Sequence, residues 1–330
     1  MSASYWDSSQ RNRWTLTRAQ LLDKRQEDIR LANALEVTQL HIYFANFIHS
    51  IGKKLRLRQE IVASAIVFFK RFYITNGFYH TDPFLTAATC LYLACKVEEL
   101  PHHLKVIFTE SQAVAMAAKV PFSYEYCDIA EFECYLMEEL DFYVIVHQPY
   151  PTLSRVFEDL ELERSCLQTA WFLVNDSYRT DVALLYPPHM IALAALYITC
   201  VLNQASMTRD MKGWFAKLNI DMVMGRGNGC LWNLCPLMII SHALGSINLL
   251  MATAPVSKIA NTRASSFTRA NTPFVYSWGA LADAAGFSLK LLDIVQDILT
   301  MYEIWSSFDD RKVLQSLDKL HKAAKEANLV

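Results

Sequence analysis

The sequence predicts an all-α protein assembled from two copies of one helical domain. Residues 83–95 and 188–200 align without a gap. They share five identities: Pro83/Pro188, Ala87/Ala192, Leu91/Leu196, Tyr92/Tyr197 and Cys95/Cys200. Each stretch opens with a proline, which suits the first turn of a helix, and no helix breaker follows. A period of about a hundred residues is too long for a solenoid repeat, so we expect duplicated domains.

The composition is typical of a well-buried globular chain with room for two domains. Of the 330 residues, 53% are hydrophobic and 19% are charged, and the formal net charge is −2. A length of this order accommodates about two domains. Because a phosphate-backbone binder needs an excess of positive charge, we expect no direct contact with nucleic acid.

The cysteines and the N-terminus both indicate an intracellular protein. No Cys-x-x-Cys pair occurs, and several cysteines fall on apolar helix faces, where a free thiol packs as a small hydrophobe. Residues 2–13 are polar and lack the apolar core of a secretory signal. We therefore expect reduced thiols at all eight cysteines: Cys90, Cys95, Cys127, Cys134, Cys166, Cys200, Cys230 and Cys235.

Apolar residues recur with helical spacing along most of the chain, and no strand pattern competes with them. The polar segment before residue 31 carries Tyr5, Trp6 and Trp14, which indicates a short helix that docks on the body. A less regular stretch follows residue 96 and includes His102 and His103. We expect helices at residues 37–51, 61–73, 83–96, 129–140, 153–160, 165–178, 188–203 and 214–222.

Several motifs resemble those of the cyclins, and longer ones resemble the cyclin C family in particular. The first set comprises Arg58-Gln59-Glu60-Ile61, Phe68-Phe69-Lys70-Arg71-Phe72-Tyr73, Asp82-Pro83 and Leu93-Ala94-Cys95-Lys96-Val97-Glu98-Glu99. The second set comprises Tyr5-Trp6-Asp7-Ser8-Ser9, the run from Trp171 to Ala194 that contains Asn175-Asp176-Ser177-Tyr178-Arg179, Tyr302-Glu303-Ile304-Trp305 and Phe308-Asp309-Asp310-Arg311-Lys312. The resemblance covers roughly residues 4–222 and 289–320.

This resemblance implies two tandem five-helix cyclin boxes with an N-terminal helix and an insertion that interrupts the second box. It also implies a nuclear regulatory subunit that activates a cyclin-dependent kinase of the Mediator kinase module, with that module's large scaffold subunits as further partners. The domains implied are an N-terminal segment at 1–36, a first box at 37–148, a second box at 149–222 plus 289–320, an insertion at 223–288 and a tail at 321–330.

The resemblance also assigns binding residues. In cyclins, a lysine at the end of the repeated helix and a glutamate of the last first-box helix bind the kinase backbone. These correspond to Lys96 and Glu133, and Glu99 belongs to the same motif as Lys96. Cell-cycle cyclins also pair an arginine with an aspartate beside a substrate-docking groove. Because His41 and Lys70 stand at those positions, that bridge cannot form and we expect no such docking.

A second cluster is expected in the second box. Trp171, Asn175 and Asp176 share one helix face by their spacing, with Tyr302 of the last helix as a possible neighbour. They resemble the cyclin C groove that receives the large scaffold subunit. An aromatic anchor beside polar residues is also typical of interface hot spots, although a tryptophan at this position could equally be a core residue.

We expect no catalytic residue, no cofactor and no metal. Phosphoryl transfer needs a phosphate-binding glycine loop, a lysine and metal-holding carboxylates in a defined frame. The glycine cluster at residues 225–229 does not follow a strand, so it is expected to be a turn. His102 and His103 lack the spacing of metal ligands.

Residues 223–288 interrupt a helix, because the apolar spacing that stops near Met222 resumes at Leu289. Our favoured interpretation is a translated retained intron; the alternative is an inserted loop that folds outside the box. Residues 230–254 are apolar enough to resemble a membrane span, although polar residues and a proline interrupt them. Two rival functions stay open. The apolar segment leaves open a protein anchored in a membrane, and the cyclin fold leaves open a nucleic-acid-binding general transcription factor.

Overall fold

The computed structural model describes residues 4–202 and 289–327, and every regular element within them is a helix. The predicted all-α class is confirmed. The chain divides into two compact units, of which the first comprises residues 1–148, 175–188 and 310–330. The second comprises residues 149–174 and 189–309. The domain bounds inferred from the sequence stay a prediction.

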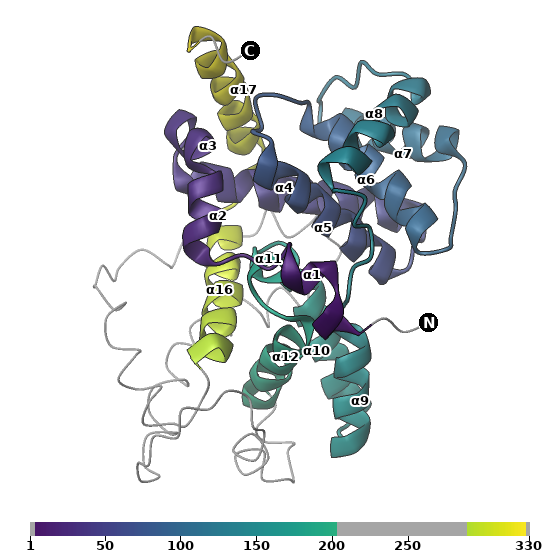
Figure 1. The fold of residues 1–330 in the computed structure, drawn as a ribbon, viewed down its shortest axis with the longest axis vertical. Helices are drawn as coiled ribbons and strands as arrows, with labels where there is room; N and C mark the ends of the chain where they lie inside the picture. Colours follow the sequence, from purple (N-terminus) through teal and green to yellow (C-terminus); the bar gives the residue numbers. More distant parts are fainter. Residues whose placement is uncertain (1–3, 203–288, 328–330) are drawn as a thin grey trace. The chain divides into compact units, whose positions relative to one another are not determined.

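Helices α4 to α8 form the body of the first unit (Figure 1). α5 is buried along its whole length from Ile61 to Ile74, because apolar residues occupy most of its circumference. α6 packs on α5, and α8 packs in turn on α6. The bounds are Ala34–Lys54 for α4, Gln59–Thr75 for α5, Pro83–Val97 for α6, Leu104–Ala117 for α7 and Tyr126–Glu139 for α8.

Helix α7 lies in the stretch that the sequence pattern left irregular. Its buried residues are Ile107, Ser111 and Ala115, which follow one another at four-residue intervals. Only one of them is a large apolar residue, whereas Met116, an apolar residue of the same helix, is 66% exposed. The helix therefore buries a narrow stripe of small side chains, which apolar periodicity does not reveal.

The N-terminal strap, which we define as residues 5–31, is wound into short helices that dock on the first unit. Trp14 is buried, and the Arg71 guanidinium lies 5.0 Å from its ring centre. The Gln10 side chain exchanges hydrogen bonds with the backbone of His147, donating at 3.3 Å and accepting at 2.6 Å. The helices of the strap are η1 (Tyr5–Asp7), α1 (Ser9–Asn12), α2 (Arg18–Lys24) and α3 (Gln26–Leu31).

The C-terminal helix α17 (Asp310–Glu326) also belongs to the first unit and packs on α3 and α4. Both α17 and α3 also form a hydrogen bond to the backbone of Phe78, a residue that lies outside both helices. The Phe78 carbonyl accepts a hydrogen bond from His321 Nε2 at 3.0 Å, and the Phe78 N–H donates to the Asp28 carboxylate at 3.1 Å. Burial raises the pKa of Asp28 to about 6, although this backbone hydrogen bond opposes the shift.

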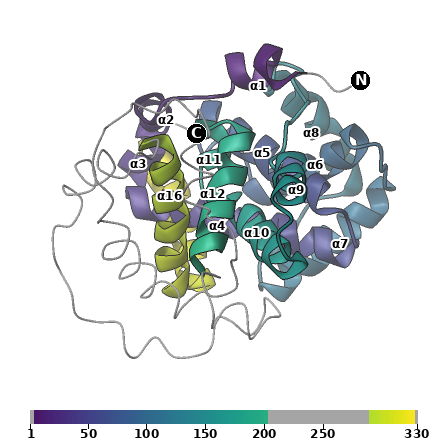
Figure 2. The same cartoon turned by 90° about the horizontal axis from the view of Figure 1, so that it is seen from below.

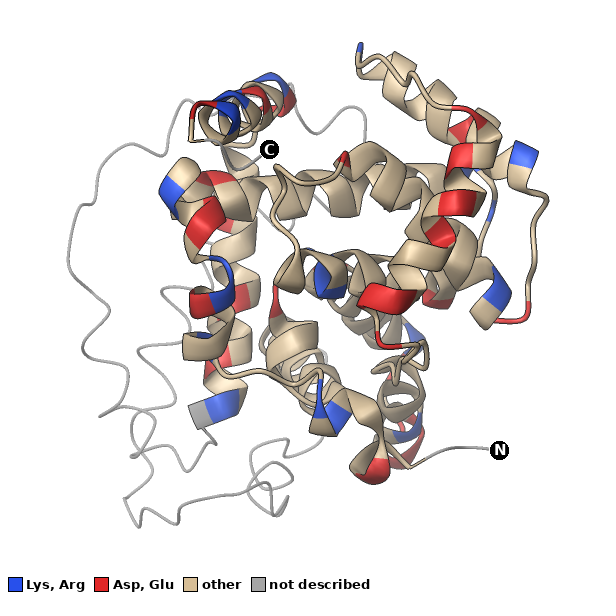
Figure 3. Ribbon diagram, turned by 45° about the horizontal axis from the view of Figure 1, so that its top comes forward, with Lys and Arg blue, Asp and Glu red and all other residues tan. Residues whose placement is uncertain are grey.

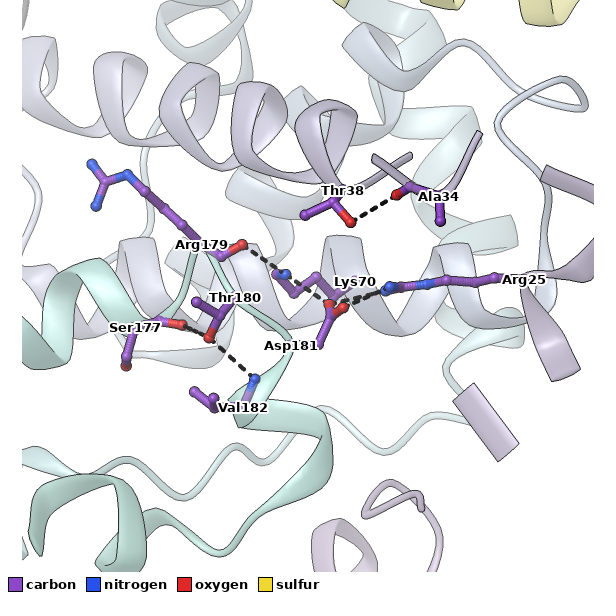
Figure 4. A network of polar contacts seen from close by, with 9 residues as sticks. All are labelled: Arg25, Ala34, Thr38, Lys70, Ser177, Arg179, Thr180, Asp181 and Val182. Carbon is purple, nitrogen blue, oxygen red and sulfur yellow. Dashed lines mark hydrogen bonds and ion pairs between the residues drawn. The ribbon is translucent and has the colours of Figure 1, made fainter. Parts of the chain in front are cut away.

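A buried charge network lies between α5, the strap and the segment at residues 176–182 (Figure 4). Asp181 accepts two hydrogen bonds from the Arg25 guanidinium, at 2.7 and 3.0 Å, and one from Lys70 Nζ at 3.0 Å. Lys70 Nζ also donates to the Arg179 carbonyl at 3.2 Å. Two cations, Arg25 and Lys70, thus share the Asp181 carboxylate as their counter-charge.

This charge arrangement fixes the protonation of its members. Burial by itself would raise the pKa of Asp181, but the charges of Arg25 and Lys70 outweigh it and hold that pKa well below the ordinary value. His41 lies close to the same groups, and burial together with the two cations holds its pKa well below 6.5. Neither ring nitrogen of His41 has a hydrogen-bond partner among the described residues. The expectation that His41 and Lys70 form no bridge is consistent with this geometry.

The described part of the second unit is also helical. Figures 1 and 2 show α12 beside α16, and α9 beside α10. α12 begins at Pro188, as α6 begins at Pro83, so both copies of the repeated sequence are helices of the same length. The bounds are Tyr150–Leu160 for α9, Arg164–Ser177 for α10, Pro188–Leu202 for α12 and Leu289–Ser306 for α16, while the short α11 (Val182–Leu185) belongs to the first unit.

Some expectations fall outside the described residues. These are the helix at 214–222, the insertion at 223–288, the turn at 225–229, the apolar stretch at 230–254 and two cysteines, Cys230 and Cys235. Within the described ranges, no helix is long and apolar enough to cross a membrane. The six cysteines in those ranges are free thiols, and Cys90, Cys95, Cys166 and Cys200 are buried as the apolar pattern predicts.

We predict that Asp181→Ala lowers the free energy of unfolding by about 3–5 kcal/mol, because Arg25 and Lys70 would remain buried without a counter-charge. Urea unfolding followed by circular dichroism measures the change. A native carboxyl with a lowered pKa stabilises the fold above its unfolded pKa and loses that effect as the pH falls through the folded value. The difference between the variant and the wild type should therefore be complete at neutral pH and shrink only below about pH 3.9.

Lys24→Ala is the control, since this exposed lysine lies in α2 close to Arg25 in sequence. It should leave the unfolding curve unchanged. An Asp181→Ala variant as stable as the control would show that the network contributes nothing to folding.

Candidate functional site

Lys96 stands at the end of α6, where the helix leaves the core. The helix starts at an Asp82 cap, which accepts the Phe84 N–H at 2.7 Å, and its small residues allow close packing on α5 and α8. The Lys96 side chain is 40% exposed and forms an ion pair with Glu133 of α8. Its ammonium also lies 4.5 Å from the centre of the Tyr92 ring. The structure thus brings together two of the predicted binding residues.

The residues after Lys96 form a tight helix ending that separates the roles of two glutamates. The Leu100 N–H donates to the Cys95 carbonyl at 2.9 Å and the Glu99 N–H donates to the Lys96 carbonyl at 3.3 Å, with Glu99 at φ 55°. This is the Schellman pattern, in which glycine usually takes the left-handed position. Glu98 points inward and accepts a 2.6 Å hydrogen bond from Ser64, whereas Glu99 is exposed.

Helix α8 gives this region a strong negative charge. Acidic residues follow one another along the helix at the right of Figure 3. No lysine or arginine occurs between Val120 and Ser154. The acidic residues are Glu125, Asp128, Glu131, Glu133, Glu138, Glu139 and Asp141. A partner that binds here must supply positive charge or hydrogen-bond donors.

Apolar side chains are exposed in the turn after α8. Phe142 is 65% exposed, Ile145 is 59% exposed and Tyr143 is 37% exposed. Two contacts fix the backbone of the turn: Arg71 donates to the Tyr143 carbonyl at 3.1 Å, and Arg13 pairs with Asp141 at 3.0 Å. Neighbouring exposed apolar residues on a fixed backbone are typical of a binding surface. The sequence pattern missed them because it does not tell an exposed apolar residue from a core one.

The predicted second-box cluster is distributed over two helices. Trp171 and Asn175 of α10 are both half-buried, and the Trp171 ring lies 4.6 Å from the Tyr150 ring of α9, centre to centre. Tyr302 of α16 is buried and stacks with Trp305 at 6.4 Å. Trp171 is thus neither a fully buried core residue nor a freely exposed anchor, and the scaffold role of the cluster stays a prediction.

Asp176 has a structural contact that the sequence did not indicate. Its carboxylate pairs with Arg179 Nη1 at 2.5 Å, and Arg179 Nε donates to Asn46 of α4 at 2.7 Å. Because Arg179 is buried, removal of Asp176 would leave its charge without this partner. No group of residues that could hold a metal ion occurs in the described parts of the chain.

Comparisons with known proteins agree with this geometry. Residues 10–145 match the family model described as "Cyclin, N-terminal domain". Cyclin-C of Drosophila melanogaster is 42% identical over 233 residues, which cover 67% of this chain and 84% of that protein. A chain of the yeast TFIIK (Kin28/Ccl1/Tfb3) complex matches with 28% identity and a TM-score of 0.50, covering 62% of this chain and 93% of that one.

A third relative extends further along the chain. The "RNA polymerase II holoenzyme cyclin-like subunit" of Debaryomyces hansenii is 31% identical over 362 residues, which cover 96% of this chain and 98% of that protein. An alignment of that extent runs past residues 223–288. Whether the segment is an inserted loop or a translated intron stays a prediction, and sequencing of the mature transcript would separate the two.

The fold and these matches define a regulatory subunit of a cyclin-dependent kinase, a class of protein that is not itself catalytic. Within that class, the chain belongs to the cyclin C family.

Proposed function

We propose that this cyclin binds and activates the cyclin-dependent kinase of the Mediator kinase module and thereby regulates RNA polymerase II transcription in the nucleus. The names of its relatives support this proposal, since they are Cyclin-C and an RNA polymerase II holoenzyme cyclin-like subunit. In the structure, the observation that carries it is the Lys96–Glu133 pair, together with the exposed apolar residues of the turn that follows Glu133's helix α8.

The proposed kinase-binding surface comprises Lys96, Glu99, Glu133 and the turn with Phe142 and Tyr143. The apolar side chains supply area to be buried, and the charged groups supply hydrogen bonds that fix the orientation of the partner. Lys96 and Glu133 hold each other in place before binding, so fewer side-chain rotamers are lost when the kinase arrives. The Lys96 side chain is 40% exposed, so its ammonium is open to a partner, whereas the Glu133 side chain is only 12% exposed and is largely covered in the free cyclin.

Activation follows from differential binding. In a protein kinase, a mobile helix carries a glutamate that must pair with the active-site lysine. A rigid partner surface that contacts only the inward position of that helix shifts the population toward the active state. The first unit suits this role because α8 packs on α5 and α6. The turn after α8 is fixed by Arg71 of α5 and by Arg13 of the strap.

For the scaffold subunits of the module, we propose a second surface with Trp171, Asn175 and Asp176 as its contact residues; Tyr302, which is 3% exposed, would contribute only through packing. The half-burial of Trp171 supports it, because an anchor needs both a supported ring and an accessible face. The Asp176–Arg179 pair adds a condition. Part of any effect of an Asp176 substitution should reflect folding, so binding and stability must be measured together.

We predict that Lys96→Ala and Glu133→Ala each weaken kinase binding by roughly 1.5–3 kcal/mol, because each loses a charged hydrogen bond at an interface. That corresponds to a rise in Kd of about 10- to 150-fold. Titration of the purified kinase against each variant, with an activity assay at saturation, measures both effects. Thermal stability should be unchanged in Lys96→Ala, whose side chain is 40% exposed, and it is measured for Glu133→Ala as well because that side chain is only 12% exposed.

Glu131→Ala serves as the matched control, because Glu131 is exposed on α8 two residues from Glu133. Its affinity for the kinase should equal that of the wild type. Full binding and activity in both Lys96→Ala and Glu133→Ala would contradict the assigned surface.

We predict that Trp171→Ala abolishes recruitment of the scaffold subunit and leaves the cyclin–kinase pair intact. Truncation of an aromatic hot spot typically costs 2 kcal/mol or more. Co-purification of kinase and scaffold with each variant provides the measurement. Phe172→Ala is the control, since Phe172 is 41% exposed on the neighbouring position of α10. Recruitment that survives Trp171→Ala, or simultaneous loss of kinase binding, would refute a separate scaffold surface.

A further inference from the structure

Four exposed cations lie close together where α4 turns into α5. We define the basic turn as Lys53, Lys54, Arg56 and Arg58, and all four are exposed. Lys54 pairs with Glu110 of α7 at 3.6 Å. The other three side chains have no carboxylate partner among residues 4–202 and 289–327. This is a concentration of positive charge in a chain whose net charge is −2.

The backbone of the basic turn is fixed. The Leu57 N–H donates to the Gly52 carbonyl at 2.9 Å, which ends α4 in a Schellman motif with Arg56 in the left-handed position at φ 52°. Gly52 lets the helices approach, since a Cβ there would lie 2.5 Å from a methyl carbon of Val62 on α5. The cations are therefore presented from a rigid base.

The residue in the left-handed position is informative. Glycine adopts this conformation freely, whereas an L residue with a side chain costs roughly 1–2 kcal/mol. Here the position holds Arg56, whose exposed guanidinium makes no contact that would offset this cost within the described chain. Residues in this conformation occur at ligand-binding sites as well as at ordinary helix ends, and Arg56 is one of six non-glycine residues with positive φ in the described ranges. The alternation of half-buried Leu55 and Leu57 with exposed Arg56 and Arg58 directs both guanidinium groups outward.

The chemistry of the basic turn favours a compact anion on a peptide. Guanidinium groups bind phosphate through paired hydrogen bonds, and two of them without carboxylate partners match a doubly charged phosphate. Affinity for duplex nucleic acid grows with the number of phosphates that a protein neutralises along the strand, and four cations within one turn neutralise few of them. The acidic α8 of the same unit would also repel an extended polyanion.

We propose that the basic turn binds phosphorylated segments of the substrates of the partner kinase. This inference rests on the proposed function, because a kinase partner is the source of such segments. Retention of a substrate that already carries one phosphate raises its local concentration at the active site, so further sites on the same chain are phosphorylated sooner.

The first experiment measures fluorescence anisotropy of a labelled serine-rich peptide with one phosphoserine, titrated with the full chain in complex with its kinase. The same peptide without phosphate, a DNA duplex and vesicles of anionic lipid are parallel probes. We expect the phosphopeptide to bind at least about tenfold tighter than its unphosphorylated form. Arg56→Gln with Arg58→Gln should remove that difference. The matched control is Lys24→Gln with Arg30→Gln, two exposed cations of α2 and α3, and it should keep the difference.

The outcomes separate the two proposals. Kinase pull-down by the Arg56→Gln, Arg58→Gln variant should equal that of the wild type. Loss of kinase binding in this variant would overturn the inference and assign the basic turn to the kinase interface. Failure of the wild type to bind any kinase would overturn the proposed function instead.

Three further results would also overturn the inference: equal affinity for both peptides, a phosphopeptide preference that survives the double substitution, or tighter turn-dependent binding to DNA or vesicles. A second variant, Arg56→Gly, relieves the left-handed strain and guards against a folding artefact. It should be at least as stable as the wild type and still bind the phosphopeptide more weakly.

Discussion

The Asp181 carboxylate joins three segments of the first unit that lie far apart in the sequence. Arg25 reaches it from the strap, Lys70 reaches it from α5, and Asp181 itself comes from the segment that follows α10. Both cations are buried, so each depends on this carboxylate for its counter-charge. The positions of the strap and of α5 are coupled through this one group, which water can reach only in part.

The same coupling supports the proposed kinase-binding surface. Lys70 and Arg71 are adjacent residues of α5. Lys70 donates to Asp181, and Arg71 donates to the Tyr143 carbonyl in the turn after α8. The strap covers Arg71 with Trp14. The exposed aromatic residues of that turn are thus presented by a backbone that is tied to the buried network. A surface held in this way can favour one state of a partner helix, because it does not deform to fit the other.

Two helix endings of the first unit share the same backbone geometry. The helix ending after Lys96 and the basic turn are both Schellman motifs in which a charged residue, Glu99 or Arg56, takes the place usual for glycine. Both motifs fix the backbone and display a charge at the surface. The two displayed charges are opposite in sign: Glu99 belongs to the proposed kinase-binding surface, and Arg56 belongs to the basic turn.

The sequence by itself determined the helical class, the duplication and the family, because apolar spacing, Pro83 and Pro188 are local signals and the motifs are long. Through the family resemblance it also singled out Lys96 and Glu133, whose role in kinase binding stays a prediction; that they form an ion pair with each other came from the structure. Only the tertiary structure decided that Lys70 finds its carboxylate in Asp181, since more than a hundred residues separate them and neither position has a local pattern. The helix α7 and the exposure of the turn after α8 were likewise decided by packing, because burial depends on which neighbours arrive from elsewhere in the chain.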